Sequence, residues 1–318
     1  MKNRFEVLDG WRGISISFVL AGHLLPLGSN VLGLNASVAT SGMALFFILS
    51  GFLITNILLK DQNIRKFIIR RLFRILPIAW LVLLITFVIV RPPWDIIKSY
   101  VFFYANNSES VILSASHFWS LCLEIQFYFA IAILVFIFKK RALYILPLVS
   151  LLITINRYLN GMAYSVETLF RIDEILAGCI LALIFTSDCE RLKRFIAKLN
   201  PLVMLILLLA SAHSYGGILA YFRPYMAMLL IGATLLNDEP SYTRKILSSR
   251  LLFYIASISY ALYVVHGGLR YTWLASGDDV VKYLKRPLFF LVNFGLAHLS
   301  TRYYEKYWID LGKRLTSK

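Results

Sequence analysis

The chain has 318 residues, of which 59% are hydrophobic and only 16% charged, a far larger apolar share than that of an ordinary soluble domain. Apolar runs of roughly 17 to 25 residues, the length that crosses a hydrocarbon core of about 30 Å, recur from end to end. The composition therefore excludes a soluble globular enzyme and predicts a multi-pass membrane protein.

The net charge of +16 would indicate a nucleic-acid partner in a soluble protein. Here the basic residues lie in alternate connections between apolar runs: Lys60 to Arg74, Lys139 to Arg141, Arg191 to Lys198, Arg244 to Arg250, and Lys313-Arg314. By the positive-inside rule these segments face the cytoplasm. We therefore interpret the charge as a topology signal, and expect membrane lipids and no nucleic acid as partners.

We predict an all-α, polytopic bundle of about ten spans with both termini cytoplasmic. The first apolar run carries Arg12 and His23 and lacks a small-residue cleavage site, so we interpret it as a retained span. Residues 1–318 are expected to form a single membrane domain with no appended soluble domain. The predicted spans are 11–28, 38–59, 73–91, 117–138, 142–157, 167–186, 200–214, 217–236, 251–273 and 286–304.

Charged side chains within a span are expensive and mark candidate sites. Arg12 and His23 are eleven residues apart, which places them on one helix face about 16 Å from each other. If the helix is capped near Asp9-Gly10, His23 lies slightly beyond mid-bilayer. A buried histidine can act as a general base. The alternative is a core histidine that a neighbouring hydroxyl satisfies.

A basic ridge enters the third predicted span. Lys66, Arg70 and Arg74 recur every four residues, next to Arg71, and together offer a surface that suits phosphate groups. The alternative is an anchor that contacts lipid headgroups. Arg74 directly precedes the apolar run and fits a specific role better.

The fourth predicted span has one polar face, because Ser120, Glu124 and Tyr128 follow each other at four-residue intervals. A carboxylate within a span must be neutral or paired, and Arg12, His23 or Arg171 could pair Glu124.

Three other spans carry weaker signals. In the sixth predicted span, Arg171 and Glu174 could instead satisfy each other. Ser50-Gly51 in the second permits close helix packing. His266 lies near the outer end of the ninth, where a polar tip needs no functional explanation.

Several familiar chemistries are missing from the sequence. The histidines are dispersed, and Cys122, Cys179 and Cys189 form neither a CxxC pair nor a disulfide framework. A GxSxG elbow, a P-loop and an HExxH motif are likewise missing. We therefore expect no metal site.

At this point the sequence resembles the acyltransferase-3 family of integral membrane acyltransferases over nearly its whole length. Four motifs match in order: Leu8-Asp9-Gly10-Trp11-Arg12-Gly13 with His23 in an Arg-x10-His spacing, Phe46-Phe47-x-x-Ser50-Gly51-Phe52-Leu53, Arg70-Arg71-x-x-Arg74-Ile75-x-Pro77, and Trp119-Ser120-Leu121-x-x-Glu124-x-x-Phe127-Tyr128.

Two later segments depart from the family pattern. Ser259 to His266 match, but Gly267-Gly268 stand where an aromatic residue and a proline usually follow the histidine. Glu305 is followed by Lys306-Tyr307 in place of the closing Glu-x-Pro. These departures weaken the case for His266 and Glu305 as site residues.

The resemblance implies an O-acyltransferase of the bacterial cytoplasmic membrane that moves an acyl group, expected to be acetyl, from cytosolic acyl-CoA to a hydroxyl of a glycan such as O-antigen or exopolysaccharide. The residues agree with it. Arg70, Arg71 and Arg74 would hold the CoA phosphates, and Arg12 would guide the thioester arm. His23 would act as general base or nucleophile, with Glu124 orienting it. The acceptor-binding residues are expected to be Ser50, Trp119, Ser120, Tyr128, Arg171 and Glu174.

Two other classes of protein remain open. A transporter or flippase for lipid-linked sugars would also line a path with polar groups, although the inverted-repeat symmetry typical of transporters is missing. A lipid-linked glycosyltransferase would need a pair of outer-loop carboxylates, for which Asp278-Asp279 is the candidate.

Overall fold

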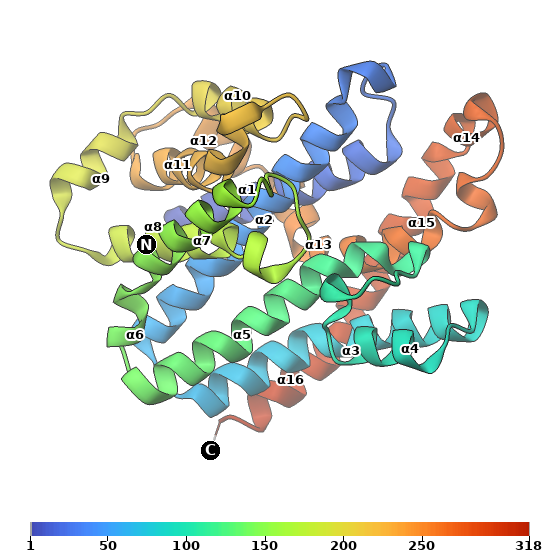
Figure 1. The fold of residues 1–318 in the computed structure, drawn as a ribbon, viewed down its shortest axis with the longest axis horizontal. Coiled ribbons are helices and arrows are strands. Elements are labelled where there is room, and N and C mark those ends of the chain that lie inside the picture. Colours follow the sequence, from blue (N-terminus) through green and yellow to red (C-terminus); the bar gives the residue numbers. More distant parts are fainter. Residues whose placement is uncertain (1, 318) are drawn as a thin grey trace. The chain divides into compact units, whose positions relative to one another are not determined.

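The computed structural model describes residues 2–317, all of whose regular elements are helices. The chain folds as two compact units. Figure 1 labels most of their helices. The first unit comprises residues 1–61, 138–165 and 169–257, and the second comprises 62–137, 166–168 and 258–318. Because each unit gathers segments from distant parts of the chain, neither corresponds to a simple half of the sequence.

In its described residues, the first unit contains nine whole α-helices and the start of a tenth. They are α1 (Lys2–Leu24), α2 (Leu34–Lys60), α6 (Arg141–Tyr144), α7 (Leu146–Leu159), α8 (Asp173–Thr186), α9 (Glu190–Ala197), α10 (Pro201–Ser211), α11 (Arg223–Leu236), α12 (Tyr242–Leu247) and the beginning of α13 (Arg250–Leu269). Short 3₁₀ turns at Asn30–Leu32 and Gly217–Phe222 precede α2 and α11.

The second unit contains the remaining helices: α3 (Ile64–Val90), α4 (Trp94–Val101), α5 (Trp119–Phe138), the rest of α13, α14 (Asp279–Leu284), α15 (Arg286–Leu299) and α16 (Lys306–Arg314). A 3₁₀ segment, η3 (Leu113–Phe118), leads into α5, and a π-helical stretch, η7 (Ser300–Glu305), joins α15 to α16. π-helical stretches of this kind are rare.

Six helical segments within residues 2–317 are long and apolar enough to cross a membrane: 34–60, 64–90, 113–138, 141–159, 217–236 and 250–269. A seventh arises if α9 and α10, bent by 81°, are counted as one broken span. The other predicted spans coincide with α1, which carries several charges, and with α8 and α15, which have 14 residues each. The all-helical membrane fold is therefore confirmed with six to seven such helices.

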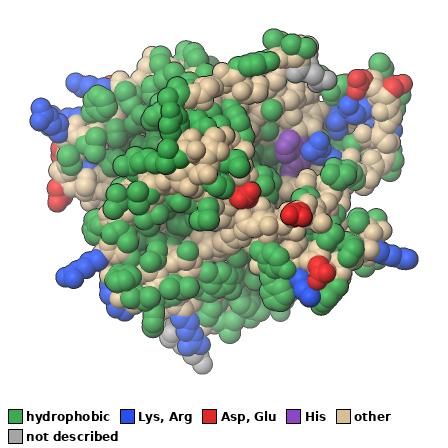
Figure 2. All heavy atoms as spheres, viewed as in Figure 1, with side chains coloured by type: hydrophobic (Ala, Val, Ile, Leu, Met, Phe, Trp, Pro, Cys, Tyr) green, Lys and Arg blue, Asp and Glu red, His purple; other side chains and the backbone are tan. Residues whose placement is uncertain are grey.

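Several helices expose broad apolar faces, as expected of segments that contact lipid (Figure 2). Along α3, Leu84, Val88 and Ile89 are 60%, 65% and 74% exposed. A contiguous face of this kind is uncommon on soluble monomers. The observation agrees with the multi-pass character that the composition predicts.

Helix α1 differs at both ends from the prediction. Its start at Lys2 places Asp9 inside the helix, so the proposed cap at Asp9-Gly10 is wrong. Val7 and Leu8 are 0% and 2% exposed, and their burial extends the helix beyond the apolar run. The helix ends at Leu24, short of residue 28, because Pro26 disfavours a helical residue before it.

The core of the first unit depends on a very close crossing of α2 and α8. A Cβ added to Gly51 would lie 1.9 Å from the carbonyl oxygen of Ile175, and one added to Gly178 would lie 2.1 Å from that of Ile48. Only glycine allows the two backbones to touch at these points. The packing interpretation of Gly51 is thus confirmed.

Candidate functional site

In the first unit, α1 presents the Arg-x10-His pair on a half-buried face. Both side chains are partly exposed, and the helical rise separates their backbones by about 16 Å. The guanidinium of Arg12 pairs with Asp9, with 3.1 Å between Nη1 and Oδ1. His23 lies in the last turn of the helix.

The orientation of α1 is fixed by buried residues on the flank next to the Arg12 and His23 face. The indole of Trp11 is buried and donates a hydrogen bond of 2.8 Å to the hydroxyl of Thr234 on α11. The Ser15 hydroxyl donates to the carbonyl of Gly42 on α2 at 2.8 Å. These buried contacts hold the rotation of α1, and therefore the direction of Arg12 and His23.

In the second unit, the basic ridge is part of α3. The side chain of Asn63 caps this helix by accepting from the amide of Lys66 at 2.9 Å, so α3 begins nine residues before the predicted span. Arg70 and Arg74 are exposed, and Arg71 is half-buried. Arg70 donates from Nε to the Thr316 hydroxyl at 2.8 Å. The ridge thus offers accessible guanidinium groups.

The polar face of α5 is present as predicted. Tyr128 donates its hydroxyl to Oε1 of Glu124 at 2.5 Å, and the hydroxyl of Ser120 lies 2.7 Å from that of Tyr263 on α13. Glu124 is only 5% exposed, while Trp119 is half-buried. Ser120, Glu124 and Tyr128 therefore share one buried face of the second unit.

A pair of buried histidines lies beside this face. The rings of His117 and His266 have centroids 5.0 Å apart. Nε2 of His117 contacts the carbonyl of Val264 at 3.1 Å. A Cβ on Gly267 would lie 1.9 Å from Cε1 of His117, so this glycine makes room for the ring. His266, expected near an interface, is in fact fully buried.

The candidate residues are divided between the two units. Arg12, His23, Ser50, Arg171 and Glu174 belong to the first unit. The second unit contains the others: Arg70, Arg71, Arg74, Trp119, Ser120, Glu124 and Tyr128. The pairing of Glu124 with His23 therefore stays a prediction.

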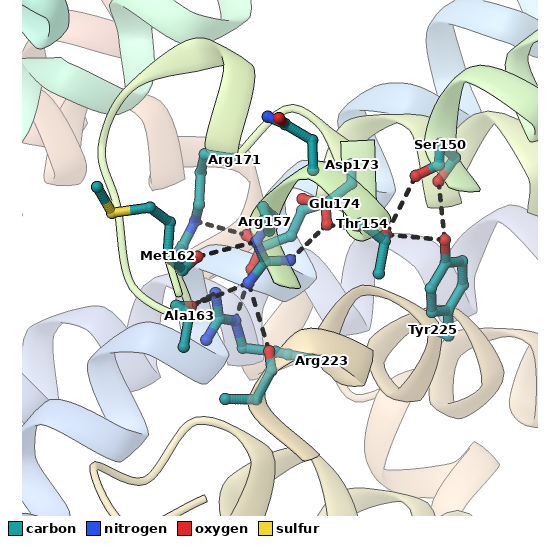
Figure 3. Close-up of polar contacts among 12 residues, drawn as sticks. Ser150, Thr154, Arg157, Met162, Ala163, Arg171, Asp173, Glu174, Arg223 and Tyr225 are labelled. Atoms are coloured by element: carbon teal, nitrogen blue, oxygen red, sulfur yellow. Dashed lines mark hydrogen bonds and ion pairs between the residues drawn. The ribbon is translucent and has the colours of Figure 1, made fainter. Parts of the chain in front are cut away.

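Arg171 and Glu174 belong to a larger ionic cluster (Figure 3). Nε of Arg171 lies 3.1 Å from Oε2 of Glu174, and Nε of Arg223 donates to Oε1 of the same carboxylate at 2.6 Å. Arg157 pairs with Asp173. These five residues, Arg157, Arg171, Asp173, Glu174 and Arg223, are named the arginine cluster below.

The arginine cluster is almost wholly buried. Arg157, Asp173, Glu174 and Arg223 are 0% exposed. The predicted alternative, in which Arg171 and Glu174 satisfy each other, is thus part of the structure. Sequence reasoning missed Arg157, Asp173 and Arg223, although Arg157 and Arg223 are charges within apolar runs, the same signal that identified Arg171.

A tyrosine and a polar group border the arginine cluster. The ring of Tyr164 lies 5.3 Å from the guanidinium of Arg223. Burial raises the pKa of the Tyr164 phenol, which therefore stays protonated and donates to the carbonyl of His213. Thr154 donates to Asp173 at 3.2 Å. Within residues 2–317 no group of three or more His, Cys, Asp or Glu is arranged to hold a metal ion.

Comparison with known proteins gives a consistent picture. A family model described as an acyltransferase domain matches residues 5–307. The chain is 27% identical to OatA of Listeria monocytogenes, named a peptidoglycan O-acetyltransferase, over 81% of this chain and 48% of that protein.

A second relative, YrhL of Bacillus subtilis, is provisionally named a peptidoglycan O-acetyltransferase. It is 27% identical over 94% of this chain and 54% of its own length. The chain thus spans about half the length of the curated relatives that it matches. No solved structure matches it.

Proposed function

Because the chain belongs to the acyltransferase-3 family, we propose that it is a membrane O-acetyltransferase that moves an acetyl group from cytosolic acetyl-CoA to a sugar hydroxyl of a cell-envelope glycan. The observation that carries the proposal is the Arg12 and His23 pair on one half-buried face of α1. A histidine that can carry a proton, on the same helix face as a guanidinium, suits the transfer of an acyl group from an anionic donor.

The donor is proposed to bind at the basic ridge of α3. Arg70 and Arg74 are exposed, and guanidinium groups match phosphate oxygens in both charge and geometry. Arg71 would add a third contact to the phosphates of CoA. Arg12 would then direct the thioester arm towards His23.

The chemistry needs one proton carrier. The acceptor hydroxyl attacks the thioester carbonyl while His23 takes its proton, and the departing CoA thiolate then receives that proton from the imidazolium. Glu124 would orient His23 and stabilise the imidazolium, as a carboxylate partner does in other histidine-based acyl transfers. Ser50, Trp119, Ser120 and Tyr128 would contact the acceptor.

We further propose ten spans in a bacterial cytoplasmic membrane, with both termini cytoplasmic and the chain forming a single membrane domain. Within the first unit, the basic segments at 139–141, 191–198 and 244–250 adjoin the start of α7 and the ends of α8 and α11. The arginine cluster lies at the opposite ends of the same helices. This alternation supports an extracytoplasmic place for the cluster.

The relatives' names favour peptidoglycan as the acceptor, with O-antigen and exopolysaccharide as the alternatives from the family resemblance. An acceptor panel would distinguish them. Label from radioactive acetyl-CoA is expected on a peptidoglycan disaccharide and not on purified lipopolysaccharide or exopolysaccharide.

The test uses the full chain in lipid nanodiscs with radiolabelled acetyl-CoA, and follows both CoA release and label transfer. His23→Ala is expected to lower turnover by about 100-fold or more, because general-base catalysis contributes at least that factor. Arg12→Ala and Glu124→Gln should also lose turnover.

His298→Ala, at a histidine outside the matched motifs, serves as the control and should keep wild-type turnover. Thermal unfolding of each variant shows that it is folded. If the folded wild type neither binds nor consumes acetyl-CoA, the enzyme proposal fails and transport of lipid-linked sugars becomes the hypothesis to test.

A further inference from the structure

The arginine cluster contains a donor that the protein leaves unused. The side chain of Arg223 is 0% exposed, and its buried Nη1 has no hydrogen-bond partner among residues 2–317. A buried, unpaired N–H of a charged group is costly, and such groups in native proteins call for an explanation. Arg223 has its Nε on Glu174 and its Nη2 near the carbonyl of Ala163.

The other contacts that the two arginines make with backbone carbonyls are mostly weak. Arg223 Nη2 to Ala163 measures 3.5 Å, Arg157 Nε to Met162 3.4 Å, and Arg157 Nη2 to Ala220 3.4 Å, all at the edge of the hydrogen-bond range. Only Arg157 Nη2 to Ala163 is short, at 2.9 Å. An anionic ligand would offer these N–H groups shorter and stronger bonds.

The connection at residues 160–165 covers the two arginines and supplies the carbonyls of Met162 and Ala163 (Figure 3). Gly161, Met162 and Tyr164 in it are exposed. Gly161 has φ +66°, and an added Cβ would have no described atom within 4 Å beyond its chain neighbours, so the turn there packs against nothing. It is the element that must lift for a ligand to reach Arg223.

Tyrosine rings surround the same place. Tyr164 lies over Arg223, and Tyr221 lies over Arg157 with 5.7 Å between ring centroid and guanidinium. Tyr158 meets Tyr221 edge-on at 5.4 Å. Tyr158 and Tyr164 are 57% and 42% exposed. Aromatic faces stack well on the C–H faces of sugar rings, and a belt of interfacial tyrosines would not explain the buried arginines beneath them.

We propose that Arg157 and Arg223 form a subsite for the carboxylate of an acidic sugar in the acceptor glycan, beneath the connection at residues 160–165. Asp173 and Glu174 beside the guanidinium groups would repel a dianionic phosphate more strongly than a singly charged carboxylate. The subsite rests on the proposed function, since that function requires a glycan acceptor on the extracytoplasmic side.

The test measures binding of two disaccharides to the full chain in nanodiscs, without acetyl-CoA. N-Acetylglucosaminyl-N-acetylmuramic acid without a stem peptide carries a free lactyl carboxylate, whereas N,N′-diacetylchitobiose, called chitobiose below, is the matched neutral compound. The wild type is expected to bind the acidic disaccharide about 10-fold more tightly, the effect of one additional charge-assisted contact.

Arg223→Lys keeps a cation beside Glu174 but removes the guanidinium fork, and should bring the preference to within about twofold while chitobiose binding stays unchanged. Tyr164→Ala, on an exposed residue outside the ion pairs, should weaken the binding of both compounds. Arg141→Lys, at an exposed arginine of the same unit, should keep the wild-type preference.

Equal binding of the two disaccharides by the wild type, or a full preference in Arg223→Lys, would overturn the subsite. The proposed function has a separate readout, because acetyl-CoA consumption is measured independently. If the protein consumes acetyl-CoA but binds both disaccharides equally, only the subsite is refuted. If it prefers the acidic disaccharide but does not consume acetyl-CoA, only the acetyltransferase proposal is refuted.

Discussion

At Gly267 on α13, the space that a Cβ would occupy is taken by the imidazole of His117, whose Cε1 would lie 1.9 Å from it. At the next position, Gly268, an added Cβ would have no atom within 4 Å among the described residues, apart from its chain neighbours and the nearby backbone of its own helix. The family pattern has an aromatic residue and a proline after the histidine. The structure therefore gives a physical reason for the departure at Gly267, because the His117 ring fills that position.

We expect Gly267→Ala to destabilise the protein and Gly268→Ala to leave its stability equal or slightly higher. Overpacking a full site costs about 1–3 kcal/mol. Alanine in place of glycine in an open helix position gains up to about 1 kcal/mol. Thermal unfolding in detergent measures both variants, and equal melting temperatures would contradict the packing of His117 against Gly267.

At the scale of helices, buried ion pairs join α7, α8 and α11 at one end. Arg157 of α7 pairs with Asp173 of α8, and Arg223 of α11 pairs with Glu174 of α8. Such pairs gain little net free energy over apolar packing, but removal of one partner leaves a buried charge uncompensated. The three helix ends are thereby held in one register.

Asp173→Asn is expected to lower the free energy of unfolding by about 3–5 kcal/mol, because it leaves the guanidinium of Arg157 buried without its anion. Asp188→Asn is the matched control, since Asp188 is exposed in the connection after α8 and should tolerate the change. Denaturant or thermal unfolding in nanodiscs gives the comparison. A loss of equal size in the two variants would show that the ion pair does not hold the helices.

The presence of the helices could be predicted, because a single long apolar segment in a membrane satisfies all of its own backbone hydrogen bonds only as an α-helix. The ten predicted ranges are all helical over most of their length, within the described residues. The start of α1 could not be predicted, because it depends on the burial of Val7 and Leu8 against other helices.

The same limit applies to the candidate site. Arg12 and His23 share one helix, so helical periodicity alone places them on the same face. Arg157 and Asp173 lie on different helices, and only tertiary packing makes them partners. Charge within an apolar run identifies such residues as candidates without identifying the partner.

For the whole molecule, the proposed membrane topology can be tested by chemical labelling of a cysteine that the protein already has. Cys122 and Cys179 are buried, and Cys189 is exposed in the connection between α8 and α9. That connection lies beside a basic segment and is proposed to be cytoplasmic. The connection after α13 is proposed to lie outside.

A membrane-impermeant maleimide should therefore not label the wild type in intact cells, and should label Cys189 once the membrane is permeabilised. Ser276→Cys, at an exposed position after α13, should be labelled in intact cells. Labelling of Cys189 in intact wild-type cells would reverse the proposed orientation.

The crossing of α2 and α8 has a mechanical consequence. Where Gly51 and Gly178 meet carbonyl oxygens of the opposite helix, the nearest atoms are backbone atoms, which cannot change rotamer to accommodate sliding. Movement of one helix along the other would first require the backbones to separate. The pair is therefore a rigid spine of the first unit, and its amides should exchange with deuterium more slowly than those of the connection at residues 160–165.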